Sequence, residues 1–315
     1  WSEQRQAGLT ALLAPGLVCD GSGSEAPRSG RADAASPGSA AEAGSGGMEP
    51  ERGPGETTAI RWPPDNLFLA DSPWPITHRN SYAQASSPLP GPADPEGLRV
   101  NVAAAPLSVS LPMGPAKTPG DFPVWGCELF EGHIYTVRQD SSGLRFGQRT
   151  ERQVTSAGLV GAYAMVDRDG IYDSPTGQRI DTFLLNDAGQ TKFQNSLRLD
   201  KAARGSLVGM NLTFDGLIAF ATADSSVGVA RRDFGAQQIL QLQDGGAVSN
   251  SIAIDEDGGI YVVTDLSMNR VQWTGETLSL DPDTGAWSAP FVLGGDLVTS
   301  WLGQGSGSTP SLMGT

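Results

Sequence analysis

Positive charge is scarce in this sequence. Charged residues make up 18% of the 315 residues, and 21 Lys and Arg face 35 Asp and Glu, which gives a formal net charge of −14. An acidic surface repels phosphate backbones, so the composition argues against a nucleic-acid partner. Cysteine is nearly absent too: the chain has two, Cys19 and Cys127, which excludes a disulfide framework and a Cys-rich zinc site.

Long apolar runs and helical patterns are missing as well. No stretch reaches the roughly 18 apolar residues of an ordinary membrane-spanning helix. The sequence also has no GxSxG motif, and its two His, His78 and His133, are far apart, so no Ser-His-Asp triad is visible. What is abundant is Gly (41) and Pro (22). Both residues interrupt helices, so this composition argues against a helical bundle.

Residues 1–60 do not have the composition of a folded domain. An apolar stretch, Ala7 to Val18, precedes Cys19, and the chain from Asp20 to Glu56 is almost entirely Gly, Ser, Ala, Pro, Glu and Arg. Such a segment buries too little apolar surface to offset its ordering entropy, which predicts a disordered tether. The order of the three parts resembles a bacterial lipoprotein leader. That resemblance implies a lipid anchor on Cys19 and an extracytoplasmic location; the alternative is a disordered tail with an incidental Cys.

A hairpin motif recurs further along the chain. Asp-Gly pairs begin at Asp169, Asp215 and Asp257, at spacings of 46 residues (169 to 215) and 42 residues (215 to 257). Each pair joins two apolar strand-like runs, and Asp-Gly in that setting favours a tight hairpin turn. A fainter copy is centred on Gly132.

Two more strand-like runs follow the second and third Asp-Gly hairpins. In one unit they are Val227 to Arg232 and Gln237 to Gln243, and in the next Asn269 to Leu280 and Ala286 to Leu293. Four antiparallel strands at this period are typical of a β-propeller blade. An all-β sandwich is the alternative, but it has no reason to repeat at this interval. One short helix over Ser196 to Gly205 is the only helical segment expected.

The repeat predicts an all-β propeller over 122–315. Blades are expected near 122–160, 161–206, 207–248 and 249–302, with a fifth begun at Ser308 to Thr315. About four blades plus a partial one suggest either a piece of a longer protein or strands supplied by Trp62 to Leu111. Residues 61–121 are Pro-rich and predict an extended wrap before the blades. Large aromatic side chains are expected to pack between blades: Trp125, Trp273, Trp287 and Trp301.

Two family resemblances lie within the repeats. Ser249 to Asp255, followed by Gly259 to Val262, resembles the blade motif of gluconolactonase-like and strictosidine-synthase-like propellers. The resemblance implies that Asn250 points into a central channel and binds a divalent metal or the substrate. The family has Gly after this Asn, where the present chain has Ser251.

The second resemblance is to quinoprotein-like propellers. Trp74-Pro75 with His78-Arg79-Asn80 is similar to the opening of their first blade, and Asp173 to Gly177 and Asp281 to Trp287 resemble their repeated turns. It implies an oxidoreductase with a Trp-lined cofactor cavity, although most of the family's stacked Trp ring is missing here.

Polar residues in the predicted loops outline a candidate site. In a propeller, the loops leading into the innermost strand and those joining the second strand to the third open on one face. Asn211 and Asn250 belong to the first kind of loop, and Asp224 and Asp265 to the second. Oxygen ligands suit Ca²⁺ or another divalent cation, so Asp224, Asp265 and Asn250 form a metal-site hypothesis, with Asn211 and Asn250 facing the ligand. The alternative is that these are ordinary loop residues bonded to their own backbone.

The favoured function is an extracytoplasmic binding or assembly module that uses its channel face for a small molecule or a protein. A metal-dependent lactonase or esterase of gluconolactonase type is the alternative, because a bound cation can polarise a carbonyl and activate water. A quinoprotein-like oxidoreductase is the second alternative. The lactonase or esterase alternative requires Asn250, Asp265 and a further carboxylate to converge on the channel axis.

Overall fold

The computed structural model describes residues 63–87, 108–109, 111–128, 132–140, 143–152, 162–291 and 308–313. The predicted leader, Cys19 and Trp301 lie outside these ranges. Within them the chain is built of β-strands and loops, with one 3₁₀ turn, η1 (Pro282–Thr284). The described ranges contain no helix that is long and apolar enough to cross a membrane.

The strands form four antiparallel sheets in chain order. The first holds β1 (Ser108–Val109), β2 (Val124–Glu128), β3 (Ile134–Asp140) and β4 (Gly143–Phe146). The second holds β5 (Met165–Val166), β6 (Tyr172–Thr176), β7 (Arg179–Leu185) and β8 (Thr191–Arg198). The third holds β9 (Leu207–Leu212), β10 (Ile218–Thr222), β11 (Ser226–Ala230) and β12 (Gln237–Gln241). The fourth holds β13 (Ala253–Ile254), β14 (Gly259–Val263), β15 (Ser267–Trp273), β16 (Leu278–Ser279) and β17 (Trp287–Pro290).

The three Asp-Gly pairs lie at the predicted hairpins, between the first and second strands of the second, third and fourth sheets. Gly170 has φ +79°, the left-handed conformation that Gly adopts without strain. In each hairpin, the side chain two residues before the Asp accepts a hydrogen bond from a backbone N–H four residues further along the chain than itself. Ile171 N donates to Asp167 Oδ1 at 2.9 Å, Leu217 N to Thr213 Oγ1 at 2.8 Å and Gly259 N to Asp255 Oδ1 at 2.6 Å. The repeat therefore extends to the bonding of each turn.

The fourth sheet departs from the simple pattern at its outer edge. β16 and β17 both pair with β15, so together they make a fourth strand that η1 interrupts. The predicted turn Asp281 to Gly285 is this interruption: Asp281 caps η1 by accepting from Asp283 N, and Gly285 ends it with φ +96°.

The hydrophobic cores lie between consecutive sheets. Side chains of the first and second sheets form one core, which includes Trp125, Cys127, Tyr172 and Phe183. A second core joins the second and third sheets, and a third joins the third and fourth. Four sheets that each pack on the next in chain order are the blades of a β-propeller, not the two stacked layers of a sandwich.

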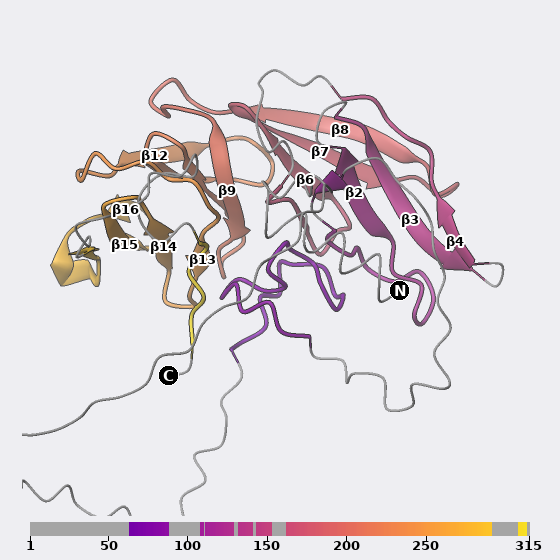
Figure 1. Cartoon of the computed structure of the whole chain (residues 1–315), viewed down its shortest axis with the longest axis horizontal. Coiled ribbons are helices and arrows are strands. Elements are labelled where there is room, and N and C mark those ends of the chain that lie inside the picture. Colours follow the sequence, from indigo (N-terminus) through magenta and orange to yellow (C-terminus); the bar gives the residue numbers. More distant parts are fainter. Residues whose placement is uncertain are drawn as a thin grey trace, which may run out of the picture.

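Residues 63–87 lie on the inner side of the blades. In Figure 1 the four sheets follow one another in an arc, and this segment, coloured indigo to purple, lies inside it. Leu69 and Ile76 bridge to Asp167 and Met165. Ser81 O accepts from Ile254 N at 2.7 Å, which ties the segment to the fourth blade as well. The segment thus covers backbone groups on the inner strand edges that would otherwise lack partners.

Three sequence expectations are corrected by the structure. Ser196 to Arg198 continue strand β8 instead of starting a helix, because they keep pairing with β7. The fainter hairpin copy around Gly132 joins the second and third strands of its blade, since β1 precedes it on the inner side. Trp287 is 41% exposed on the outermost strand, where its ring meets Tyr261 of the same blade. Trp125 and Trp273 do lie between blades, as predicted.

Candidate functional site

A polar cluster forms where the loops before β5 and β13 approach residues 63–87. The Tyr163 hydroxyl, just before β5, donates to Asn250 Oδ1 at 3.0 Å. His78 Nε2 lies 3.1 Å from Thr309 Oγ1, and the His78 and Tyr163 ring centroids are 6.0 Å apart. Ser251 N donates to the same Thr309 hydroxyl at 3.1 Å. We call His78, Tyr163, Asn250 and Thr309 the axial cluster.

The axial cluster is half-buried and carries no fixed charge. All four side chains keep some solvent exposure. Burial lowers the pKa of His78, so its imidazole is neutral near pH 7. The cluster therefore offers an amide, two hydroxyls and a neutral imidazole, which are groups that exchange hydrogen bonds with uncharged polar ligands.

Asn211 lies elsewhere, inside the protein. It is 1% exposed in β9, and its Nδ2 donates to Ser81 O at 3.0 Å and to Ile252 O at 3.1 Å. Its Oδ1 accepts from Leu212 N at 2.8 Å. This amide joins residues 63–87 to the third and fourth blades, and the same bonds occupy both of its N–H donors.

Asp224 and Asp265 follow β10 and β14, in the two predicted loops. Asp265 Oδ1 accepts from Ala247 N at 2.8 Å, while Asp224 is exposed and accepts from Gln241 through its backbone oxygen. Among the described residues, no hydrogen bond joins Asn250, Asp224 or Asp265 to one another. Nor does the described part of the chain bring three or more His, Cys, Asp or Glu together in a way that would hold a metal ion.

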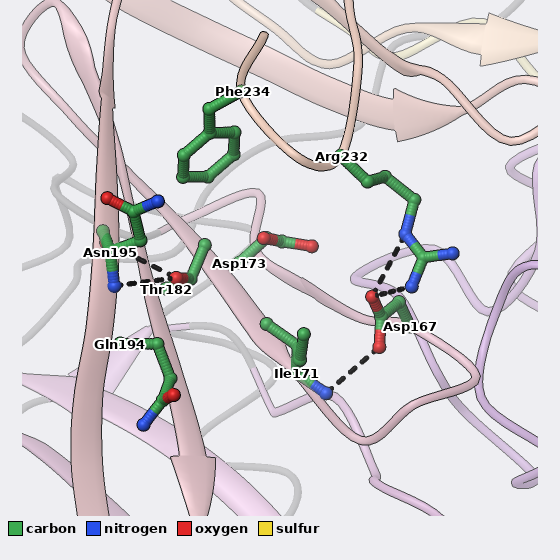
Figure 2. Close-up of a pocket in the computed structure, with 8 residues that line it drawn as sticks. All are labelled: Asp167, Ile171, Asp173, Thr182, Gln194, Asn195, Arg232 and Phe234. Carbon is green, nitrogen blue, oxygen red and sulfur yellow. Dashed lines mark hydrogen bonds and ion pairs between the residues drawn. The ribbon is translucent and has the colours of Figure 1, made fainter.

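A separate pocket opens between the second and third blades (Figure 2). Its volume is about 190 Å³. It is lined by Asp167, Ile171, Asp173, Thr182, Gln194, Asn195, Arg232 and Phe234. Asp167 and Ile171 belong to an Asp-Gly hairpin, and Arg232 and Phe234 to the turn between β11 and β12. In antiparallel sheets these turns lie at the opposite end from the loops that carry the axial cluster.

Strand register builds the floor of this pocket. Asp173 pairs with Thr182, and Thr182 with Asn195, so the three lie in one row across β6, β7 and β8. Ile180 and Leu197 lie two residues away on the same face, in the core shared with the third blade. The polar side chains of the pocket therefore lie directly beside the apolar core between the second and third blades.

Asp173 is the most unusual group in the pocket. The residue is 2% exposed, its carboxyl faces the pocket, and no described residue forms a hydrogen bond with that carboxyl. Figure 2 shows this carboxyl between Thr182 on one side and Asp167 and Arg232 on the other. Burial raises the pKa of Asp173 well above its usual range; the Asp167 charge adds to this effect and the Arg232 charge opposes it.

Sequence reasoning missed this pocket because the quinoprotein resemblance placed Asp173 in a turn. The structure places it inside strand β6, with the turn after Thr176. A signal was available: aligned on the Asp-Gly pairs, Asp173 occupies the position of Ala219 and Tyr261 in the next two units. A carboxylate where the other repeats carry non-ionised side chains marks a site that the fold alone does not require.

Known proteins resemble this chain in sequence or in structure. No family model matches the chain. A protein of Archaeoglobus fulgidus, named only as an uncharacterized protein, is 34% identical over 261 residues, which cover 80% of this chain and 49% of the relative. The chain therefore spans about half the length of the curated relative it matches.

Solved structures give weak likenesses. A streptogramin B lyase structure is 17% identical with a TM-score of 0.44, covering 61% of this chain and 57% of its own. Virginiamycin B lyase from Staphylococcus aureus is 14% identical with a TM-score of 0.40, covering 59% and 55%. At these scores the likenesses carry no argument about activity, and the propeller assignment rests on the sheets and interblade cores.

Proposed function

We propose that this chain is an extracytoplasmic β-propeller module that binds a neutral, hydroxyl-bearing small molecule at the axial cluster. The observation that supports it is the convergence of polar side chains from separate parts of the chain. His78 comes from residues 63–87, Tyr163 and Asn250 from the loops before two blades, and Thr309 from residues 308–313. Convergent polar groups at a propeller face are the usual form of a ligand site.

The absence of charge in the cluster selects the class of ligand. A charged ligand group that leaves water needs a charged partner or it costs several kcal/mol. Neither His78, which burial keeps neutral near pH 7, nor Tyr163, Asn250 or Thr309 supplies one. Hydroxyl and lactone oxygens of a sugar or sugar lactone match the amide, hydroxyl and imidazole groups, and the two rings offer apolar contact.

The extracytoplasmic location rests on the resemblance of residues 1–19 to a lipoprotein leader, with Cys19 as the proposed lipid anchor. A protein partner at the same end of the propeller is the other form of the binding hypothesis. The small-molecule form is preferred because the four side chains lie in contact with one another instead of spreading over a rim.

Thermal-shift titration with neutral monosaccharides and their δ-lactones tests the proposal. We expect at least one member to raise the melting temperature of the unmodified chain in a saturable way. Asn250→Ala and Tyr163→Phe should abolish or weaken that shift. Asn186→Ala is the matched control, because Asn186 lies in the turn between β7 and β8, at the other end of the blades.

Two results would contradict the proposal: no shift with any member of the panel, or an equal shift in Asn250→Ala. The panel includes δ-gluconolactone, so its hydrolysis can be followed with and without Ca²⁺. Hydrolysis that depends on Ca²⁺ would favour the lactonase hypothesis with Asn250, Asp224 and Asp265 as ligands.

A further inference from the structure

The pocket between the second and third blades holds more acidic than basic groups. Arg232 contacts two carboxylates, Asp167 through Nε at 3.1 Å and through Nη2, and Asp169 through Nη2. Asp167 lines the pocket, whereas Asp169 is 59% exposed and lies outside its lining. Asp173 is the second carboxyl of the lining, and it forms no ion pair among the described residues.

An unpartnered carboxyl that is almost completely buried is an expensive feature to keep. A polar group without a hydrogen bond in the interior lowers stability, and a charged one lowers it more. The equivalent positions in the next two blades, Ala219 and Tyr261, carry no carboxyl. The fold therefore does not need Asp173, whereas a ligand that bonds its carboxyl does.

The pocket walls define the shape of that ligand. Phe234 and Ile171 are apolar, and Thr182, Asn195 and Gln194 are neutral and polar. The cavity volume of about 190 Å³ is far above the roughly 10 to 15 Å³ that one water molecule needs, so a small organic ligand fits. The Phe234 ring can also attract a cation through its face.

We propose that this pocket binds a small organic ammonium ion, with the Asp173 carboxylate as its counter-ion and Phe234 and Ile171 as its apolar wall. An anion is disfavoured by the excess of carboxylates. A bare metal ion is disfavoured because the described residues hold no group of three or more His, Cys, Asp or Glu suited to one. This site is distinct from the axial cluster and does not depend on the function proposed for it.

Binding is coupled to a proton. Burial raises the pKa of Asp173, so without ligand the carboxyl keeps its proton at a pH where an exposed Asp is ionised. An ammonium ion stabilises the carboxylate, and the Asp173 proton passes to the buffer while the ligand keeps its own. Each bound cation therefore releases up to one proton, which a neutral ligand would not do.

Isothermal titration of the full chain with n-butylammonium chloride at pH 7 tests the inference. We expect saturable binding with a dissociation constant on the order of 1 to 10 mM, the range for so small a ligand. Repeating the titration from pH 5 to pH 8 in buffers of different ionisation enthalpy should show proton release wherever the ligand-free carboxyl is protonated. n-Butanol and butyrate, of similar shape but neutral and anionic, should bind at least about tenfold more weakly.

Asp173→Asn keeps the shape and removes the charge, and it should weaken n-butylammonium binding about tenfold or more. Asp233→Asn is the matched control, because Asp233 lies exposed in the neighbouring turn and an Asn oxygen can still accept from Gly235 N. Three results would overturn the inference: no saturable binding, equal binding by n-butanol or butyrate, or equal binding by Asp173→Asn. The comparison of the three ligands is made on the unmodified chain, so it decides the question even if a variant fails to fold.

Discussion

Arg232 of the third blade donates a hydrogen bond from Nε to Asp167 Oδ2 of the second blade, at 3.1 Å. The next interface repeats the arrangement with different chemistry: Trp273 Nε1 of the fourth blade donates to Asp215 Oδ2 of the third at 2.8 Å. In both pairs a side chain near the end of a third strand reaches the Asp-Gly hairpin of the preceding blade. These contacts hold consecutive blades together at one end, beyond the apolar cores.

Arg232→Met should destabilise the protein by about 2 to 3 kcal/mol, because it leaves Asp167, 2% exposed, without its cation. The effect is smaller than for a fully buried pair, since the Arg232 side chain is 19% exposed. Urea denaturation measures it. Arg231→Met is the control: its partner Asp233 is exposed, so no measurable change is expected. Equal midpoints for both variants would contradict the proposed role of the interblade pair.

Asp173→Asn should stabilise the protein increasingly as the pH rises. The folded-state pKa of Asp173 is raised above its unfolded value, so its contribution to stability is full below the unfolded pKa and is lost as pH rises toward the folded pKa. The variant lacks that loss. At about pH 8 its gain should be on the order of 1 to 2 kcal/mol. Thermal unfolding of both proteins from pH 5 to 9 measures the difference, and a constant difference would contradict the burial effect.

Asn211→Leu should lower the free energy of unfolding by about 2 to 3 kcal/mol without any ligand present. The substitution removes the donors to Ser81 O and Ile252 O and leaves those buried oxygens with fewer partners. Asn250→Ala, at a half-buried amide, should cost about 0.5 kcal/mol or less. Chemical denaturation compares the two. The reverse order of costs would mean that Asn211 is not the structural residue described here.

The folded chain should lose stability in mild acid partly through His78. Burial lowers its folded-state pKa below the usual value of about 6.5, so the stability it contributes is present above that pH and is lost as the pH falls toward the folded pKa. His78→Gln stays neutral and can still exchange a hydrogen bond with Thr309. The denaturation midpoint should therefore fall less between pH 7 and pH 5 in the variant than in the unmodified chain. An equal fall would show that His78 does not titrate in this range.

The periodic parts of the fold were predictable from sequence. The Asp-Gly pairs at 169, 215 and 257 locate three hairpins, since turn chemistry and strand alternation act over a few residues. The interrupted outer strand formed by β16 and β17 was harder to foresee, because DPDTG signals a turn but not that the chain resumes pairing with the same strand. The exposed position of Trp287 follows from that continuation.

The candidate sites depend on contacts that no local pattern records. Asn250 was singled out by a motif, but its partner Tyr163 lies 87 residues away and the neighbouring His78 comes from the Pro-rich segment. Asp173 faces the pocket only because strand register places it beside Thr182 and because the next blade supplies Arg232. Asn211 illustrates the converse, a polar side chain that bonds buried backbone instead of facing a ligand.

The axial position of residues 63–87 is tested most directly by disulfide trapping. Ile76 and Met165 are antiparallel bridge partners, and cross-strand neighbours of this kind lie within the Cα separation that a disulfide needs. In a chain carrying Cys19→Ser and Cys127→Ala, thiols introduced by Ile76→Cys and Met165→Cys should join in high yield under mild oxidation. The pair Ile76→Cys and Val262→Cys should not join, because Val262 lies in the core between the third and fourth blades. No bond in the first pair, or equal yields in both, would contradict a segment that lines the propeller axis.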